Sequence, residues 1–103
     1  MKIAIIGTGA MGSVYAGVLA EAGHEIWAID SWADHIEQIK SNGLTLEGAS
    51  GNRTITNLSA TTDADDAAAC DLYVIATKAD GVGSAAQAVA RNMREDSLIL
   101  TIQ

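Results

Sequence analysis

The sequence contains no proline, one cysteine, and six lysine and arginine residues among its 103 positions. The absence of proline excludes a proline-rich linker, whereas ten glycines indicate many tight turns and helix ends. Cys70 has no second cysteine with which to form an internal disulfide, which fits a reducing cytosol, so we expect a cytoplasmic protein. No apolar run reaches the roughly 18 residues that a membrane-spanning helix needs, so we expect no contact with a membrane.

Basic residues are too few and too scattered for a nucleic-acid partner. The formal net charge is −7, and phosphate neutralisation needs clustered lysine and arginine side chains. We interpret the excess of acidic residues as a solvated surface. With 49% hydrophobic and 18% charged residues, the composition is that of a folded chain, and its length suits one small domain with a single core.

Hydrophobic periodicity predicts a strand, a helix and a strand in the first thirty residues. Residues 3–6 form a β-branched apolar run, which indicates a strand buried on both faces. From Met11 the apolar residues recur at helical spacing, and residues 25–29 predict a second strand. The recurring helical residues are Val14, Val18 and Leu19. This order is a βαβ unit.

The middle of the chain predicts smaller elements. Apolar residues spaced three apart indicate a short helix from Ala33 that closes at the Asn-Gly pair 42–43. Two alternating runs within residues 44–58 flank a turn rich in glycine and serine, which predicts a β-hairpin or two short strands. Residues 61–63 indicate a short edge strand or a loop, and Asp63 is placed to cap a small helix that extends through Ala69.

The last third again alternates strand and helix. Residues 71–77 predict a strand, residues 83–93 a helix, and residues 97–103 a further strand. The expected buried stripe of that helix consists of Ala86, Val89, Ala90 and Met93. Together the elements predict an α/β fold, a Rossmann-type, doubly wound and mostly parallel sheet over residues 1–103. Because the chain stops directly after a predicted strand, we expect it to be the first part of a larger protein.

Three glycines follow the first predicted strand in a GxGxxG pattern and precede a predicted helix. Gly7 permits the tight turn, Gly9 leaves room for a pyrophosphate, and Gly12 lets the helix pack close to the strand. The unsatisfied N–H groups at the helix start favour an anion. We therefore predict a dinucleotide site in this loop, whose cofactor-binding residues are Gly7, Thr8, Gly9, Ala10, Met11 and Gly12.

An acidic residue ends the second predicted strand. Asp30 lies where a carboxylate accepts hydrogen bonds from the adenosine ribose, which favours the free 2′-hydroxyl of NAD over the 2′-phosphate of NADP. The neighbouring Ser31 is a second candidate contact, because its hydroxyl can donate to a phosphate. Trp32 either stacks on adenine or packs over the end of the helix. A purely structural role, with Asp30 capping the next helix, is the alternative.

Two further candidates end the strand predicted over residues 71–77. Thr77 and Lys78 lie at its carboxyl end, where open parallel sheets bind ligands. Lys78 is suited to a carboxylate, a ribose or a carbonyl oxygen, and a solvated loop lysine is the alternative. We expect no function for His24 or for His35, which falls on the polar face of its helix. No cysteine and histidine spacing matches a metal site, and no Ser/His/Asp arrangement is evident.

These segments together resemble the amino-terminal domain of the ketopantoate reductase (2-dehydropantoate 2-reductase) family. The resemblance covers essentially all 103 residues and rests on MKIAIIGTGAMGSVYAGVLAEAGHEI, HIEQIKSNGLTLEG and CDLYVIATKA. The glycine loop is shared by many dehydrogenases, whereas GLTLEG and TKA in this order are more specific to the family.

The resemblance implies reduction of ketopantoate to pantoate with NADPH, on the route to pantothenate and coenzyme A. Lys78 would contact substrate and cofactor and is the catalytic candidate in this chain. Gln103 corresponds to the residue before a substrate-binding Asn-Gly pair that is absent here. A helical carboxy-terminal domain, which supplies the main catalytic lysine and an acid, is also absent, so we expect the fragment alone to be inactive. A small 2-keto acid is the expected partner, and a homodimer is an expectation for the full-length enzyme.

One departure concerns the cofactor. Well-known family members hold the NADP phosphate with an arginine at the end of the second strand, where this chain reads IDSW with Asp30 and Ser31. The cofactor is therefore NADP by resemblance or NAD by the acid. Two other functions remain open: a nucleotide-sensing module without chemistry, and a dehydrogenase of the 3-hydroxyacid or 6-phosphogluconate type.

Overall fold

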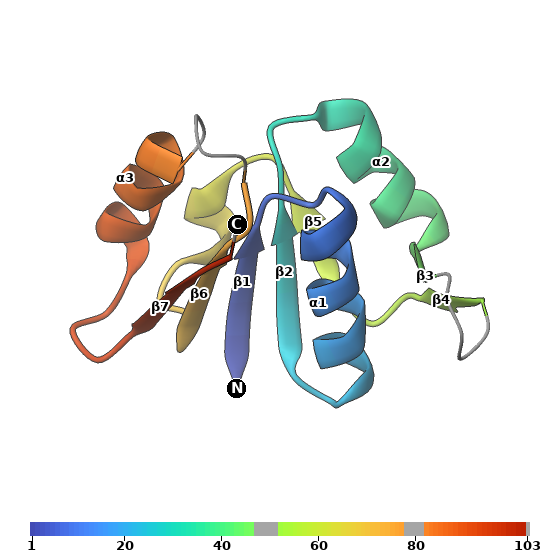
Figure 1. Ribbon diagram of the computed structural model, residues 1–103, viewed down its shortest axis with the longest axis horizontal. Helices are drawn as coiled ribbons and strands as arrows, with labels where there is room; N and C mark the ends of the chain where they lie inside the picture. The colour runs from blue at the N-terminus through green and yellow to red at the C-terminus, as the bar shows by residue number, and fades with distance from the viewer. Residues whose placement is uncertain (47–51, 78–81, 103) are drawn as a thin grey trace.

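The computed structural model describes residues 1–46, 52–77 and 82–102, and its centre is a five-stranded sheet (Figure 1). The strands lie in the order β5-β2-β1-β6-β7, and every neighbouring pair is parallel. Their bounds are β1 (Lys2–Ile6), β2 (Glu25–Ile29), β5 (Ser59–Thr61), β6 (Leu72–Ile75) and β7 (Leu98–Thr101). The strand order steps outward in both directions from β1, which confirms the predicted Rossmann-type α/β fold.

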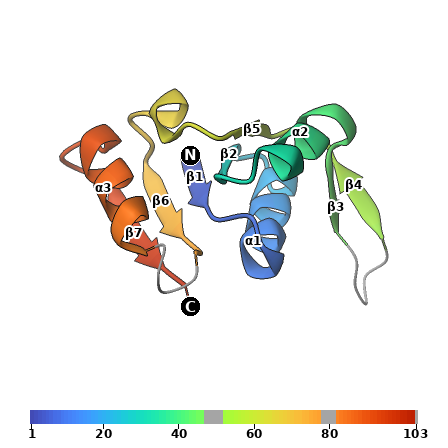
Figure 2. The ribbon, with the colours of Figure 1, turned by 90° about the horizontal axis from the view of Figure 1, so that it is seen from above.

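Helices cover both faces of this sheet (Figure 2). The α1 helix (Ala10–Glu21) and the α2 helix (Ala33–Asn42) pack on one face. The α3 helix (Val82–Asn92) and the short 3₁₀ helix η1 (Ala64–Ala67) pack on the other. Beside the sheet, β3 (Leu44–Leu46) and β4 (Arg53–Ile55) pair in antiparallel fashion. This confirms the strand pair expected within residues 44–58; its predicted turn lies partly outside the described residues.

Two apolar layers hold the helices to the sheet, because alternate residues of each strand point to opposite faces. In β1, Ile3 and Ile5 face α1 and α2, whereas Ala4 and Ile6 face η1 and α3. All four are buried. A strand that is apolar on both faces is therefore explained by helices on both sides.

The buried side of α1 does not carry the most hydrophobic residues of the helix. Ala16 and Ala20 are fully buried, whereas Val14 and Val18 are 48% and 47% exposed. Small residues face the sheet because the helix lies close to β1 and β2, which leaves no room for branched side chains. Helical spacing thus predicted the helix correctly but did not show which side is buried.

The expected stripe of α3 was wrong at two positions. Ala85 and Val89 are the buried residues, whereas Ala86 and Ala90 are exposed. Met93 packs against the core in part, as expected. Two alanines one residue apart differ by about 100° around a helix, so the direction of the sheet alone decides which of them is covered.

The helix between β5 and β6 is shorter than predicted. Asp63 caps η1 by accepting from the Asp65 N–H at 2.9 Å, but η1 ends at Ala67 rather than Ala69. Residues 59–61 form strand β5 at one sheet edge, and β7 forms the other edge among the described strands. No helix in the described ranges is long and apolar enough to cross a membrane.

Candidate functional site

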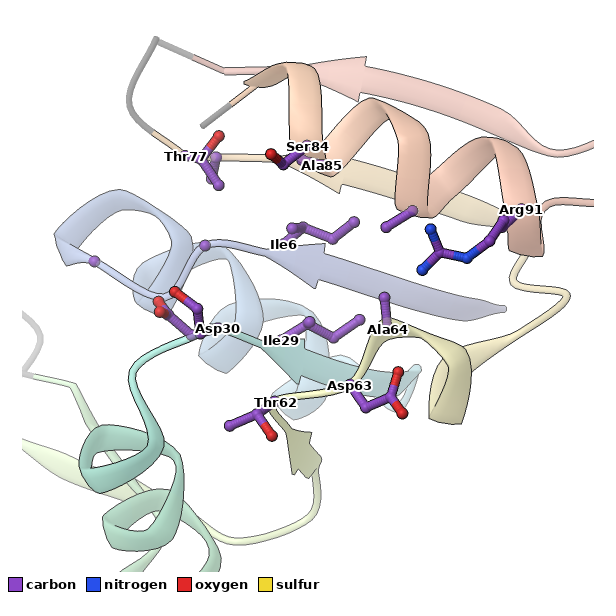
Figure 3. A pocket seen from close by; sticks show the side chains of 15 residues that line it. Ile6, Ile29, Asp30, Thr62, Asp63, Ala64, Thr77, Ser84, Ala85 and Arg91 are labelled. Atoms are coloured by element: carbon purple, nitrogen blue, oxygen red, sulfur yellow. The ribbon is translucent and has the colours of Figure 1, made fainter. Parts of the chain in front are cut away.

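A groove of about 800 Å³ opens between η1 and α3 and reaches the loop after β1 (Figure 3). Its floor includes Ile6 and Ile29, the last residues of β1 and β2. Alanines of η1 and α3 line its walls, and Asp30 and Arg91 lie toward opposite ends. A mostly apolar groove with a few polar groups at the carboxyl ends of parallel strands is a typical small-molecule site.

The three glycines of the loop lie in three different structural environments. Gly7 has a φ of +100°, and a Cβ there would lie 2.9 Å from the Ala76 carbonyl carbon and the Thr77 nitrogen. A Cβ at Gly12 would lie 1.8 Å from the Gly7 carbonyl oxygen, so only glycine lets α1 approach the loop this closely. A Cβ at Gly9 would meet no atom within 4 Å. Gly7 and Gly12 therefore serve the fold as predicted, whereas Gly9 borders open space.

The start of α1 is suited to an anion. No side chain caps the helix, and its first turn contains no acidic residue, so the backbone N–H groups there are available. Near Gly7, the hydroxyl oxygen of Thr77 is buried without a hydrogen-bond partner in the described structure. Both features fit a phosphorylated ligand, whose oxygens accept from N–H and O–H donors.

Asp30 is hydrogen-bonded to the glycine loop. Its Oδ2 accepts from the Thr8 N–H and from the Thr8 hydroxyl, both at 2.8 Å. Its Oδ1 accepts from the Trp32 N–H at 3.0 Å. A carboxylate offers about four acceptor positions, so Oδ1 retains capacity for one more donor. The side chain is therefore held at the edge of the groove, with one oxygen able to accept from a ligand.

The hydrogen bonds of Asp30 lower its pKa. Burial raises the pKa of the carboxyl, but the bonds from Thr8 and Trp32 and the nearby His35 lower it more, so the pKa lies below its ordinary value of 3.8. Asp30 is therefore ionised at neutral pH and presents a negative charge at the groove.

His35 of α2 contacts the same loop, which the sequence did not indicate. Its Nε2 lies 2.9 Å from the Thr8 carbonyl oxygen, and the Ser13 hydroxyl donates to that oxygen at 2.8 Å. The exposed Trp32 stacks on His35 with ring centroids 5.3 Å apart. We expected no function for His35 from its place on the polar face of the helix, and its contacts with Thr8 and Trp32 were not predictable, since helical position shows only the side of the helix and not its neighbours.

The groove brings together part of the predicted set. Gly7, Gly9, Asp30, Ser31 and Thr77 line it. The other residues predicted in the glycine loop take different positions. Thr8 and Gly12 are buried behind the groove, Ala10 begins α1, and Met11 is exposed. Lys78 lies outside the described residues.

Several lining residues were not predicted as site residues. Thr62 and Asp63 come from the segment after β5, and Ser84, Ala88 and Arg91 come from α3. Arg91 pairs with the Asp65 carboxylate at 3.3 Å. Only their spacing of three and four residues along α3 hinted that Ser84, Ala88 and Arg91 share one side of a helix.

Comparison with known proteins identifies the family. A profile described as ketopantoate reductase PanE/ApbA matches residues 3–103. The 2-dehydropantoate 2-reductase of Pyrococcus horikoshii is 35% identical, with 100% of this chain and 33% of that protein covered. These comparisons do not give better support to a sensing module or to another dehydrogenase type.

Solved structures of similar fold agree with this match. A PanE/ApbA family ketopantoate reductase from Ralstonia eutropha aligns with a TM-score of 0.92 and 36% identity, over 100% of this chain and 34% of that one. A D-mandelate dehydrogenase solved with NADH and anilino(oxo)acetate aligns with a TM-score of 0.88 and 32% identity, over 99% and 33%. The chain thus spans about a third of the relatives that it matches. It belongs to the ketopantoate reductase PanE/ApbA family.

Proposed function

We propose that this chain binds the nicotinamide dinucleotide of a 2-keto acid reductase. The open space at Gly9 beside the uncapped start of α1 carries the proposal, because it offers free N–H groups and room for a diphosphate. The apolar groove beyond it suits the adenosine part, with Asp30 at its edge. The unpartnered hydroxyl of Thr77 gains an acceptor when a ligand fills this end of the groove.

We further propose that the dinucleotide is NADH rather than NADPH. Asp30 is ionised, and its Oδ1 has capacity for one ribose hydroxyl. A 2′-phosphate beside that carboxylate would place like charges together. Within the described residues, Arg91 is the only cationic side chain lining the groove, and it lies away from Asp30 and pairs with Asp65. The NADH bound in the related D-mandelate dehydrogenase supports this choice.

The proposed reaction is reduction of ketopantoate to pantoate, as the names of the relatives indicate. A nicotinamide bound here would supply the hydride for the 2-keto carbon, and a proton would complete the new hydroxyl group. This chain's part is to hold the diphosphate at Gly9 and to orient the adenosine ribose through Asp30. Lys78 remains the predicted contact to substrate and cofactor. We propose that the other catalytic groups come from a domain outside this chain.

Calorimetric titration with NADH and NADPH at equal ionic strength tests cofactor binding. We expect Gly9→Val to weaken NADH binding at least 10-fold, because the new side chain fills the space of the diphosphate. Gly83→Val is a matched control, because a Cβ there also meets nothing within 4 Å and Gly83 does not line the groove. Unchanged NADH affinity in Gly9→Val would contradict the proposed diphosphate position.

Asp30→Asn tests the preference for NADH. Removing the charge should bring the two affinities closer, with NADPH gaining about 10-fold relative to NADH. Asp63→Asn is the control, because it removes a carboxylate that lines the same groove at η1. Tighter binding of NADPH than of NADH by the unchanged chain would contradict the cofactor proposal and leave the dinucleotide site standing.

The reaction is tested in the full-length protein that carries this chain. Oxidation of NADH is followed with ketopantoate and with other 2-keto acids, and Lys78→Met is compared with the unchanged enzyme. We expect the highest kcat/KM with ketopantoate and a large loss of kcat in Lys78→Met. A higher kcat/KM with another 2-keto acid would replace the substrate, and nucleotide binding without any turnover would favour a sensing module.

A further inference from the structure

The carbonyl oxygen of Thr8 accepts two side-chain hydrogen bonds from two helices. Ser13 of α1 donates its hydroxyl at 2.8 Å, and His35 of α2 approaches with Nε2 at 2.9 Å. Because a carbonyl oxygen only accepts, Nε2 carries the hydrogen. The His35 ring is itself held against the stacked ring of Trp32. The carbonyl is therefore directed toward α2, away from the groove.

The direction of this carbonyl decides the direction of the next N–H. In a planar trans peptide the C=O of one residue and the N–H of the following residue point in opposite directions. With the Thr8 oxygen turned toward His35, the Gly9 N–H points to the opposite side, and Gly9 lines the groove. Among the described residues this N–H has no acceptor. It is thus presented to whatever occupies the start of α1.

Gly9 makes this peptide easy to rotate. Glycine populates many backbone conformations, and no atom lies within 4 Å of the position where its Cβ would be. A rotated peptide would direct the Thr8 oxygen into the groove, where a partial negative charge would repel a diphosphate. The glycine that leaves room for the ligand therefore needs an external restraint on its orientation.

We infer that His35 is a positioning residue, acting together with Ser13, that holds the Thr8–Gly9 peptide with its N–H toward the diphosphate. This inference rests on the proposed dinucleotide function. The two hydrogen bonds to Asp30 fix only the Thr8 N–H and hydroxyl, that is, the preceding peptide and the side chain. The Thr8–Gly9 peptide itself is restrained from the far side by His35 and Ser13.

Three variants separate positioning from simple packing. His35→Leu removes the donor to the Thr8 carbonyl and retains most of the bulk of the side chain. His35→Gln retains an N–H donor near the same place, because its amide nitrogen corresponds to Nε2. His24→Leu is the control, because this half-buried histidine follows α1 at the other end of that helix.

Affinities for NADH, ADP-ribose and adenosine are measured by calorimetry on the 103-residue chain and its variants. We expect His35→Leu to weaken NADH and ADP-ribose by about 3- to 10-fold and to leave adenosine unchanged, since only the diphosphate ligands use the Gly9 N–H. Ser13→Ala combined with His35→Leu should weaken them further. His35→Gln should restore most of the loss, and His24→Leu should match the unchanged chain.

A ligand-free measurement accompanies the titrations. The ¹³C resonance of the Thr8 carbonyl and the ¹⁵N resonance of Gly9 should shift in His35→Leu and return in His35→Gln. Equal losses for adenosine and ADP-ribose, or a loss in His35→Leu that His35→Gln does not restore, would overturn the inference, as would unshifted Thr8 and Gly9 resonances. If the unchanged chain binds neither NADH nor ADP-ribose, the proposed function fails instead, and the inference fails with it.

Discussion

One oxygen of Asp30, Oδ2, accepts two hydrogen bonds from the single residue Thr8, one from its N–H and one from its hydroxyl. Thr8 belongs to the loop after β1, and Asp30 directly follows β2. The two bonds join the carboxyl ends of neighbouring parallel strands. Asp30 therefore stabilises the loop in addition to its proposed contact with ribose.

Thr8→Val should lower the free energy of unfolding by about 1–3 kcal/mol, because a hydrogen bond to a charged group is lost in a buried residue. The bond from the Thr8 N–H remains, so the loop should keep its course. Urea unfolding measures the difference. Thr45→Val on β3 makes the same chemical change at an exposed position, so equal destabilisation of the two variants would contradict the role assigned to the Thr8 hydroxyl.

Gly12→Ala should destabilise the fold far more than Gly9→Ala. The Gly12 methyl would overlap the Gly7 carbonyl oxygen, and the backbone must shift to relieve it, which costs about 3 kcal/mol or more. Gly9→Ala places its methyl in open space and should change stability by about 1 kcal/mol or less. Thermal and urea unfolding of both variants checks this order, and similar stabilities would show that α1 does not approach the loop so closely.

Acid should destabilise the protein through carboxylates that are hydrogen-bonded in the fold. The Lys2 N–H and the Arg94 guanidinium lower the pKa of Asp71, and the hydrogen bonds of Asp30 outweigh its burial and lower its pKa as well. In the unfolded chain these groups take up protons near pH 3.8, before the folded ones do. Their stabilisation is thus present above that pH and is lost as the pH falls through the lower folded pKa values.

Urea unfolding at a series of pH values from neutral to acid measures this loss. Asp71→Asn should flatten the acid limb of the stability profile, because the side chain no longer takes up a proton. Asp34→Asn, which changes an exposed carboxylate in the first turn of α2, serves as the control. A profile of Asp71→Asn as steep as that of the unchanged chain would show that this carboxylate does not contribute.

Tyr73→Phe should cost about 1–3 kcal/mol of stability, because the buried Cys70 N–H loses its hydrogen-bond acceptor. The fully buried Tyr73 hydroxyl accepts from the Cys70 N–H at 3.1 Å and lies 3.1 Å from the Asn92 carbonyl oxygen. It thereby ties the end of α3 to β6. Tyr15→Phe removes the hydroxyl of a partly exposed tyrosine on α1, so a comparable loss there would contradict this explanation.

Local patterns in the sequence predicted most of the elements and their order. The run of β-branched residues before Gly7, the helical spacing after Met11 and the alternation around the hairpin each depend on neighbours a few positions apart. The reasons for Gly7 and Gly12 were predictable too, because a strand that turns directly into a helix packed against it leaves no space for a side chain.

Contacts between elements were decided only by the tertiary structure. Thr8 meets Asp30 across 22 positions and His35 across 27, and neither pairing follows from spacing along the chain. The buried sides of α1 and α3 likewise depend on how closely each helix approaches the sheet, which selects Ala16 over Val14 and Ala85 over Ala86. The sequence alone determined that a glycine loop with an acid at the next strand would form; strand order and helix distance decided which side chains hold that loop.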